Sequence, residues 1–249
     1  MKAMVLAAGL GTRLRPLTDD RPKALVEVGG RTLLDITLNR LRNFGIHDVI
    51  INVHHYADMV IERVKAAGNF GMRIEFSRED ILLDTGGGLK KAAWFLGGTS
   101  SAQAEEPFIL HNVDVISTID LQRMVEVHNE GKALATLAVQ ERKTSRYLLF
   151  NEQRELCGRR LVKEEKTEMV QPARQVAKLA FTGIHVISPR IFPLLAEEGI
   201  FSIVPAYLRL ASQGEKVMAF RADEYYWRDL GKPENIQQAE RDIKANLVQ

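Results

Sequence analysis

The sequence predicts an α/β fold in which a mostly parallel sheet carries helices on both faces. In the first half of the chain, short apolar runs typical of buried strands alternate with segments whose apolar residues recur at helical spacing. This alternation indicates βαβ units, which build parallel sheets. The 249 residues are 45% hydrophobic, so the chain can bury a sizeable core, and its length fits one large domain.

The expected elements follow in order along the chain. From residue 141 to about residue 178 the sequence is largely polar. A charged run at 163–166 within this stretch is typical of a solvated hairpin or loop. A closing helix is expected to begin at Pro233, because proline is favoured in the first turn. Strands are expected at 4–8, 49–53, 73–76, 108–113, 134–139, 181–187 and 217–220, and helices at 34–44, 57–67, 88–96, 121–128 and after Ile203.

The composition argues against several classes of protein. The formal net charge of +2 argues against a nucleic-acid-binding protein, which concentrates a strong basic excess. No apolar stretch approaches the roughly 18 residues of a membrane span, and the first apolar run reaches a glycine turn too soon for a signal peptide. The single cysteine, Cys157, cannot form an intrachain disulfide. We therefore expect a cytoplasmic protein with neither nucleic acid nor membrane as a partner.

The first expected strand runs into a loop that has the chemistry of a phosphate site. Gly9 and Gly11 let the backbone approach a phosphate closely, with amide groups turned toward it. Arg13 offers a planar fork for phosphate oxygens, and Lys23 offers a compact positive charge. The Walker and dinucleotide-binding loops do not fit, because no Gly-Lys-Ser/Thr follows and Leu14 stands where a third glycine is needed. The loop therefore predicts a triphosphate site.

Two aspartates are candidates for a metal site. Asp114 follows the apolar run 108–110, and Asp229 follows the aromatic run 225–227, so both are expected at strand ends. The carboxyl ends of strands are where open α/β sheets bind ligands. Since Mg²⁺ prefers one or two carboxylates together with phosphate oxygens and water, the pair suits a magnesium ion bound beside a phosphate.

Taken together, these motifs resemble the sugar-1-phosphate nucleotidyltransferase family. The string from Leu6 to Thr18, with Pro22-Lys23, is similar to the family signature, and further family-like motifs recur in order over nearly the whole chain. They are Asp84-Thr85-Gly86-Gly87-Gly88, Asn112-Val113-Asp114, Phe181-Thr182-Gly183 and Trp227-Arg228-Asp229-Leu230-Gly231. The Asp-Thr-Gly-Gly-Gly form and the short chain are most similar to the N-acetylmuramate-1-phosphate uridylyltransferase branch. Mannose-1-phosphate and heptose-1-phosphate guanylyltransferases are close alternatives.

The resemblance implies a Rossmann-like fold, with a nucleotide-binding half at 1–140 and a sugar-binding half with a closing helix at 141–249. It also implies Mg²⁺-dependent transfer of a nucleotidyl group from an NTP to a sugar-1-phosphate, with release of pyrophosphate. Arg13, Lys23 and Asp114 are then catalytic, and Asp114 and Asp229 hold the metal. Asn112 and Gly183 contact the sugar. The implied nucleotide site consists of Leu6, Ala8, Gly9, Gly11, Thr12, Arg13 and Lys23, together with Thr85, Gly86 and Gly87, which lie against the base.

One residue departs from the family pattern. The family usually places glycine between the Asn and Asp positions, where this chain has Val113. A β-branched residue is unsuited to a positive φ, so a conformational need for glycine there would change activity or acceptor choice. A catalytically silent relative that binds nucleotide sugars, and an enzyme that uses phosphocholine or another phosphorylated alcohol as its acceptor, are therefore alternative hypotheses. The residues alone fix neither the base nor the sugar nor the oligomeric state.

Overall fold

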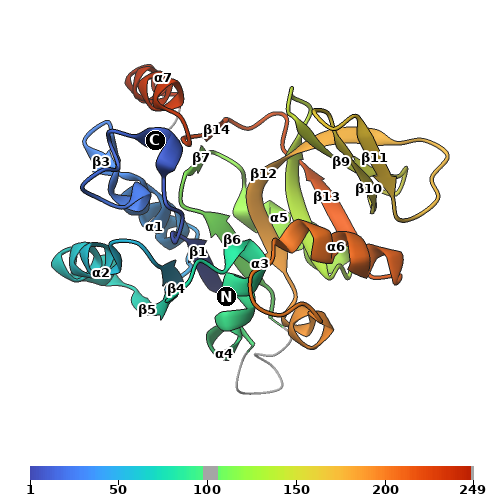
Figure 1. Cartoon of the computed structure of the whole chain (residues 1–249), viewed down its shortest axis with the longest axis horizontal. Helices are drawn as coiled ribbons and strands as arrows, with labels where there is room; N and C mark the ends of the chain where they lie inside the picture. The colour runs from blue at the N-terminus through green and yellow to red at the C-terminus, as the bar shows by residue number, and fades with distance from the viewer. Residues whose placement is uncertain (98–105, 248–249) are drawn as a thin grey trace.

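The computed structural model describes residues 1–97 and 106–247 (Figure 1). One large sheet contains β1 (Lys2–Leu6), β4 (Asp48–Val53), β5 (Arg73–Arg78), β6 (Phe108–Asn112), β8 (Ala135–Gln140), β9 (Arg146–Phe150), β10 (Leu156–Leu161), β11 (Lys166–Met169), β12 (Ala177–Ile187) and β13 (Val217–Arg221). Its order is β11-β10-β9-β12-β6-β1-β4-β5, with β8 paired to β12 and β13 paired to β8. Two short pairs join β2 (Glu27–Val28) to β3 (Arg31–Thr32) and β7 (Val115–Ser117) to β14 (Trp227–Asp229).

The strand directions make this a mixed sheet with a parallel core. β1 lies parallel to β4 and β6, β4 lies parallel to β5, and β8 lies parallel to β13. β12 runs antiparallel to β6, β8 and β9, and it therefore joins the first half of the chain to the second within one sheet. The predicted fold class is confirmed.

Helices cover both faces of the sheet, because alternate strand residues point to opposite sides. Val5 and Ile51 pack into a core with α1 (Leu33–Asn43) and α2 (Ala57–Ala66). Met4 and Ile50 pack on the other face with α3 (Asp84–Lys91), α4 (Ala93–Leu96) and α6 (Ile203–Ser212). In Figure 1, α1 and α2 accordingly lie on one side of the central strands and α6 on the other. The remaining helices are α5 (Leu121–Glu130), α7 (Pro233–Lys244) and the 3-10 helices Thr12–Leu14, Lys23–Leu25, Gly68–Gly71 and Pro189–Leu194.

The polar stretch in the second half forms an antiparallel lobe of β9, β10 and β11 beside β12 (Figure 1). Residues 163–165 of the charged run lie in the exposed turn between β10 and β11, and Lys166 begins β11, so the predicted solvated hairpin or loop is confirmed as a hairpin. Within the described ranges, no helix is both long enough and apolar enough to cross a membrane.

Candidate active site

The first glycine loop follows β1 and is tied to the neighbouring strand β4. The backbone amide of Ala7 donates a hydrogen bond to Asn52 Oδ1 at 2.7 Å, and Asn52 lies near the end of β4. A side chain at Gly9 would meet no heavy atom within 4 Å, so the backbone there faces open space. Gly11 has a φ of +67°, and its carbonyl accepts a hydrogen bond from Thr18 Oγ1 at 2.9 Å. The loop is therefore fixed at both ends and open in the middle.

Lys23 and Asp114 form an ion pair although 91 residues separate them. Lys23 begins the 3-10 helix Lys23–Leu25, and Asp114 lies in the turn between β6 and β7. Their side chains are only 12% and 17% exposed, so the pair is shielded from water on most sides. An ammonium and a carboxylate are thus held together at the carboxyl end of β6, where open α/β sheets bind ligands.

The second aspartate reaches the same place through the short pair of β7 and β14. Asp229 stands opposite Val115 in this antiparallel pair, and the amide of Leu230 donates to the carbonyl of Asp114 at 2.8 Å. Asp229 Oδ1 accepts a hydrogen bond from the amide of Gly231 at 2.5 Å. The β7–β14 pairing therefore brings the backbones of the two aspartates predicted as metal ligands side by side, although 115 positions separate them in the sequence.

Gly231 also brings Arg13 close to Asp229. A Cβ built on Gly231 would lie 2.5 Å from Arg13 Nη2 and 2.7 Å from Asp229 Oδ1. The guanidinium and the carboxylate thus occupy the space that any larger residue at 231 would need. Arg13 is an exposed residue of the 3-10 helix Thr12–Leu14 that follows the glycine loop.

This arrangement fits a metal ion that takes some of its ligands from the protein and the others from a bound substrate. Asp114 and Asp229 offer hard carboxylate oxygens, and Mg²⁺ is commonly held by one or two carboxylates plus phosphate oxygens and water. Among the described residues, no group of three or more His, Cys, Asp or Glu side chains could hold a metal without such help. The residues present therefore suit Mg²⁺ beside a phosphate and do not suit a site made of protein ligands alone.

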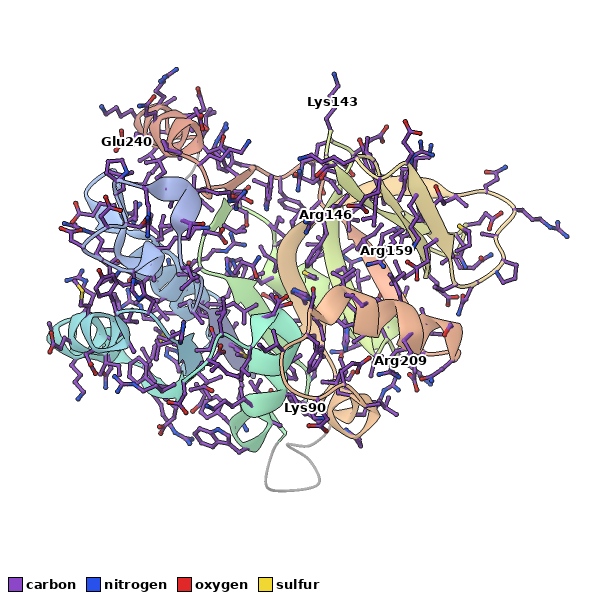
Figure 2. The ribbon with its side chains drawn as sticks, in the orientation of Figure 1. Lys90, Lys143, Arg146, Arg159, Arg209 and Glu240 are labelled. Carbon is purple, nitrogen blue, oxygen red and sulfur yellow. The ribbon has the colours of Figure 1, made fainter. Side chains whose placement is uncertain are left out.

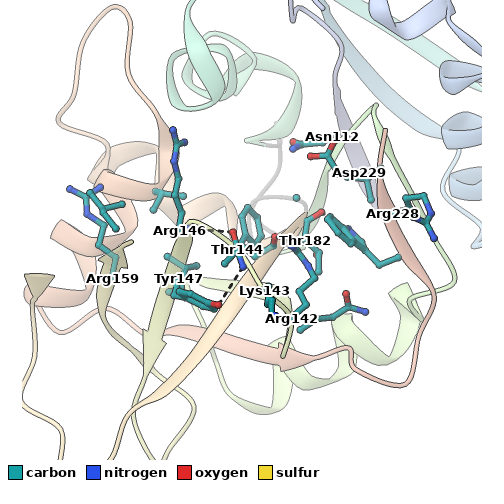
Figure 3. Close-up of a pocket in the computed structure, with 18 of the residues that line it drawn as sticks. Asn112, Arg142, Lys143, Thr144, Arg146, Tyr147, Arg159, Thr182, Arg228 and Asp229 are labelled. Carbon is teal, nitrogen blue, oxygen red and sulfur yellow. Dashed lines mark hydrogen bonds between the residues drawn. The ribbon is translucent and has the colours of Figure 1, made fainter. Parts of the chain in front are cut away.

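Two cavities meet at Asn112, which lines both of them. The smaller has a volume of about 350 Å³, and its lining includes the predicted residues Leu6, Ala8, Gly9, Lys23, Thr85 and Asp114. The larger has a volume of about 920 Å³, and its lining includes Arg13, Gly183 and Asp229 (Figure 3). Gly11, Thr12, Gly86 and Gly87 line neither cavity. The structure therefore places the predicted nucleotide and sugar residues largely in two separate but adjoining spaces.

The second glycine motif is not an open loop. We expected a helix from residue 88, but α3 begins at Asp84 and includes all three glycines, which are buried. A Cβ on Gly86 would lie 2.3 Å from the Phe201 ring, and one on Gly87 would lie 2.4 Å from the carbonyl of Gly199. Their amides both donate to the carbonyl of Phe201, at 2.9 and 3.2 Å. These glycines therefore allow close packing of α3 on the 199–201 segment, and only Thr85 of the predicted base-binding residues lines the smaller cavity.

Position 183 requires glycine because of its backbone conformation and because Asn112 packs closely against it. Its φ is +84°, and an added Cβ would lie 2.7 Å from Asn112 Nδ2. The strand β12, which contains Gly183, pairs with β6, which ends at Asn112. The two predicted sugar-binding residues are thus in direct contact.

Val113 adopts an ordinary backbone conformation and does not need to be glycine. Its φ is not positive, and its side chain is 4% exposed and packs in the core with α1. Its amide donates to the carbonyl of Leu6 at 3.1 Å. The conformational concern raised by the sequence is therefore removed.

Several residues of the site were missed by sequence reasoning. Asn52 joins the glycine loop to buried Glu79, because Asn52 Nδ2 donates to Glu79 Oε1 at 2.7 Å. The guanidinium of Arg142 stacks on the Trp227 ring at 3.8 Å, and Arg142 Nη2 donates to the carbonyl of Phe181 at 2.8 Å. Burial lowers the pKa of Arg142, and nearby Asp229 opposes this shift. The polar Asn52 at the end of an apolar strand was the one available signal in the sequence.

His111, the residue before Asn112 in β6, is buried beside the site. Burial lowers its pKa to about 3, so the ring is neutral near neutral pH. Its Nδ1 lies 2.8 Å from the carbonyl of Asn112. A neutral, buried ring is consistent with a structural residue of β6.

Known proteins resemble this chain over most of its length. The sequence profile of the family described as Nucleotidyl transferase matches residues 2–246. An N-acetylmuramate alpha-1-phosphate uridylyltransferase of Caulobacter vibrioides is 35% identical over 242 residues, which cover 93% of this chain and 92% of the relative. A mannose-1-phosphate guanyltransferase of Yarrowia lipolytica is 29% identical over 239 residues, which cover 95% of this chain but 62% of the relative. Among solved structures, HddC from Yersinia pseudotuberculosis complexed with GMP-PN has a TM-score of 0.75 at 22% identity, over 97% of this chain and 99% of that chain, which indicates a shared fold.

Proposed function

The chain belongs to the nucleotidyl transferase family and is a sugar-1-phosphate nucleotidyltransferase; we propose that its donor is UTP and its acceptor N-acetylmuramate-1-phosphate. The observation that carries the proposal is the meeting of two cavities at Asn112, with Lys23, Asp114, Asp229 and Arg13 around the junction. The choice of UTP and of this sugar rests on the Caulobacter relative, which is similar over nearly its whole length.

In this proposal the smaller cavity holds the nucleoside of the donor. The open backbone at Gly9 leaves room for the phosphates to approach the loop amides. Thr85 lines the same cavity, and its hydroxyl accepts a hydrogen bond from the amide of Ile203 at 3.0 Å. That bond fixes the hydroxyl oxygen and leaves its hydrogen to be donated to a base carbonyl.

The larger cavity holds the sugar-1-phosphate. An oxygen of the acceptor phosphate attacks the α-phosphorus of the donor in line, the bond between the α-phosphorus and the bridging oxygen breaks, and pyrophosphate leaves with the electron pair. No group of the protein is covalently modified, so catalysis depends on positioning and on stabilising charge. Lys23 provides a positive charge at the junction of the cavities, and Arg13 binds phosphate oxygens of the donor and of the departing pyrophosphate.

Asp114 and Asp229 are the proposed ligands of Mg²⁺. When bound, the ion neutralises phosphate charge as the new bond forms. Lys23 already pairs with Asp114 in the structure, so the lysine both orients this carboxylate and stands beside the phosphates that it is proposed to bind.

Transfer from GTP to mannose-1-phosphate or heptose-1-phosphate is the second candidate. It is supported by the Yarrowia guanyltransferase, at lower identity and over a smaller share of that relative. A catalytically silent relative is less well supported, because Val113 has an ordinary conformation. All the residues proposed for catalysis lie around the junction.

The test is pyrophosphate release across the four NTPs and a panel of sugar-1-phosphates that includes phosphocholine as a non-sugar acceptor, with and without Mg²⁺. Release with UTP and N-acetylmuramate-1-phosphate, dependent on Mg²⁺, is the expected result. Release only with GTP and a mannose- or heptose-1-phosphate would move the specificity to the second candidate. Absence of release with every pair, in a protein that still binds nucleotide sugars, would contradict the enzymatic proposal.

A further inference from the structure

The larger cavity has more positive charge than a single sugar phosphate requires. Cationic side chains outnumber carboxylates along its lining. Two of the arginines are already neutralised: Arg159 by Glu168 at 2.8 Å and Arg228 by Asp242 at 2.8 Å. Lys143 extends away from the ribbon in Figure 2. Within the described part of the chain, five lining cations remain without an ion-pair partner: Arg13, Arg142, Lys143, Arg146 and Lys232.

Arg142 provides positive charge at the end of the cavity near Asp229, where the reaction is proposed to take place. Its guanidinium is stacked on Trp227, and its pKa responds to the charge of Asp229. Trp227 and Asp229 belong to the same short strand, β14. Arg142 thus lies on the side of the cavity that the 1-phosphate and Mg²⁺ are proposed to occupy.

Arg146 is different, because it lies across the cavity from that end. It is the first residue of β9, and Figure 3 shows it on the opposite side of the cavity from Asn112 and Asp229. Its side chain is exposed, and within the described part of the chain it has neither a carboxylate partner nor a side-chain hydrogen bond. Glu164 and Asp229 also line this cavity, but within the described part of the chain neither forms an ion pair with Arg146. A guanidinium that lines a binding cavity without an ion-pair partner is suited to a ligand carboxylate, which it can hold by two parallel hydrogen bonds.

A second feature of the same cavity also favours an anion. The N-terminal end of α6 contributes Ser202, Val204 and Pro205 to the lining. Ser202 is the N-cap residue of this helix, yet its hydroxyl makes no capping hydrogen bond. The first turn of a helix carries a partial positive charge, so it adds to the attraction that Arg146 exerts on an anion.

We infer that Arg146, aided by the start of α6, determines specificity by binding a second anionic group of the acceptor, a carboxylate that is separate from the 1-phosphate. This inference rests on the proposed function and deepens it. N-acetylmuramate carries such a carboxylate on its lactyl ether, whereas N-acetylglucosamine, the same sugar without that ether, does not. The enzyme accordingly selects acidic sugars by charge as well as by shape.

The test measures the affinity of the protein for product nucleotide sugars by calorimetry, in parallel with pyrophosphate release. Three ligands are compared: UDP-N-acetylmuramate, its lactyl amide, which has the same shape without the charge, and UDP-N-acetylglucosamine. The variant is Arg146→Gln. The matched control is Arg160→Gln on the adjacent strand β10, since Arg160 lies outside the lining of the larger cavity and its loss removes the same charge from the same lobe.

The expected result is that the wild-type protein prefers the acid over the amide by about 10- to 100-fold, and that Arg146→Gln removes most of this preference. Arg160→Gln retains the preference. Equal affinity of the wild-type protein for acid and amide, or an unchanged preference in Arg146→Gln, would overturn the inference even where pyrophosphate release shows that transfer occurs. Absence of pyrophosphate release with every donor and acceptor would instead count against the proposed function.

Discussion

Replacing Gly231 by alanine tests whether Arg13 and Asp229 act together at the site. The new Cβ would lie 2.5 Å from Arg13 Nη2 and 2.7 Å from Asp229 Oδ1, so both groups have to move. The φ of Gly231 is not positive, so alanine can adopt the backbone. The atoms that clash are the ends of side chains, and we expect the free energy of unfolding to change by less than about 1 kcal/mol. Displacing a charged contact to phosphate costs about 1.5–3 kcal/mol, so kcat/KM should fall about 10- to 100-fold.

The assay is steady-state pyrophosphate release combined with urea unfolding, applied to Gly231→Ala, Arg13→Ala and the double variant. If the alanine acts by displacing Arg13, its effect on kcat/KM shrinks when Arg13 is already absent. Strictly additive effects would show that the two positions act independently. Wild-type activity in Gly231→Ala would refute the reasoning altogether.

Three further results are expected. Asp114→Asn lowers kcat by at least ~100-fold because it removes a preorganised charge, and near wild-type turnover at saturating Mg²⁺ would contradict its role. Gly183→Ala destabilises the fold by about 1–3 kcal/mol because its φ of +84° disfavours a side chain and its Cβ would strike Asn112; an unchanged urea midpoint would show that the strain is absent. Stability falls as the pH drops below the ordinary histidine value, because buried histidines with lowered pKa stay neutral in the fold while the unfolded chain takes up protons. Between about pH 7.5 and about pH 5.5 the loss is about 1 kcal/mol per histidine, and equal urea midpoints at the two pH values would contradict it. The pKa is lowered by burial to about 3 for His111 and His185 and to about 4 for His128.

The alternating part of the fold could be predicted because its signals are local. The apolar spacing of 34–41, with Gly45 after it, corresponds to α1, and Gly45 has the expected left-handed backbone with a φ of +75°. The short strands β7 and β14 were harder to predict, since three residues carry too little periodicity to be recognised. Their pairing is nevertheless what brings Asp229 to Asp114.

The second glycine motif shows the main limit of local reasoning. Glycines are unfavourable inside helices, so the motif indicated a loop leading into a helix from residue 88. Glycine is needed in this helix because the helix packs closely against Phe201 and Gly199, which lie more than 100 positions away in the sequence. Gly231 is a similar case, because its small size matters only once Arg13 is placed beside it. Contacts of this kind cannot be derived from spacing along the chain.

The central claim is that one nucleotidyl group moves from a triphosphate to a sugar phosphate at the junction of the two cavities. Its most direct test is ³¹P NMR of the wild-type protein with UTP, N-acetylmuramate-1-phosphate and Mg²⁺, followed by the same reaction with Asp114→Asn. The account predicts that the wild-type protein forms a nucleoside diphosphate sugar and pyrophosphate in equal amounts, and that the variant forms both far more slowly. Release of inorganic phosphate without a diphosphate sugar would contradict it, because the bond broken would then lie between the β- and γ-phosphates.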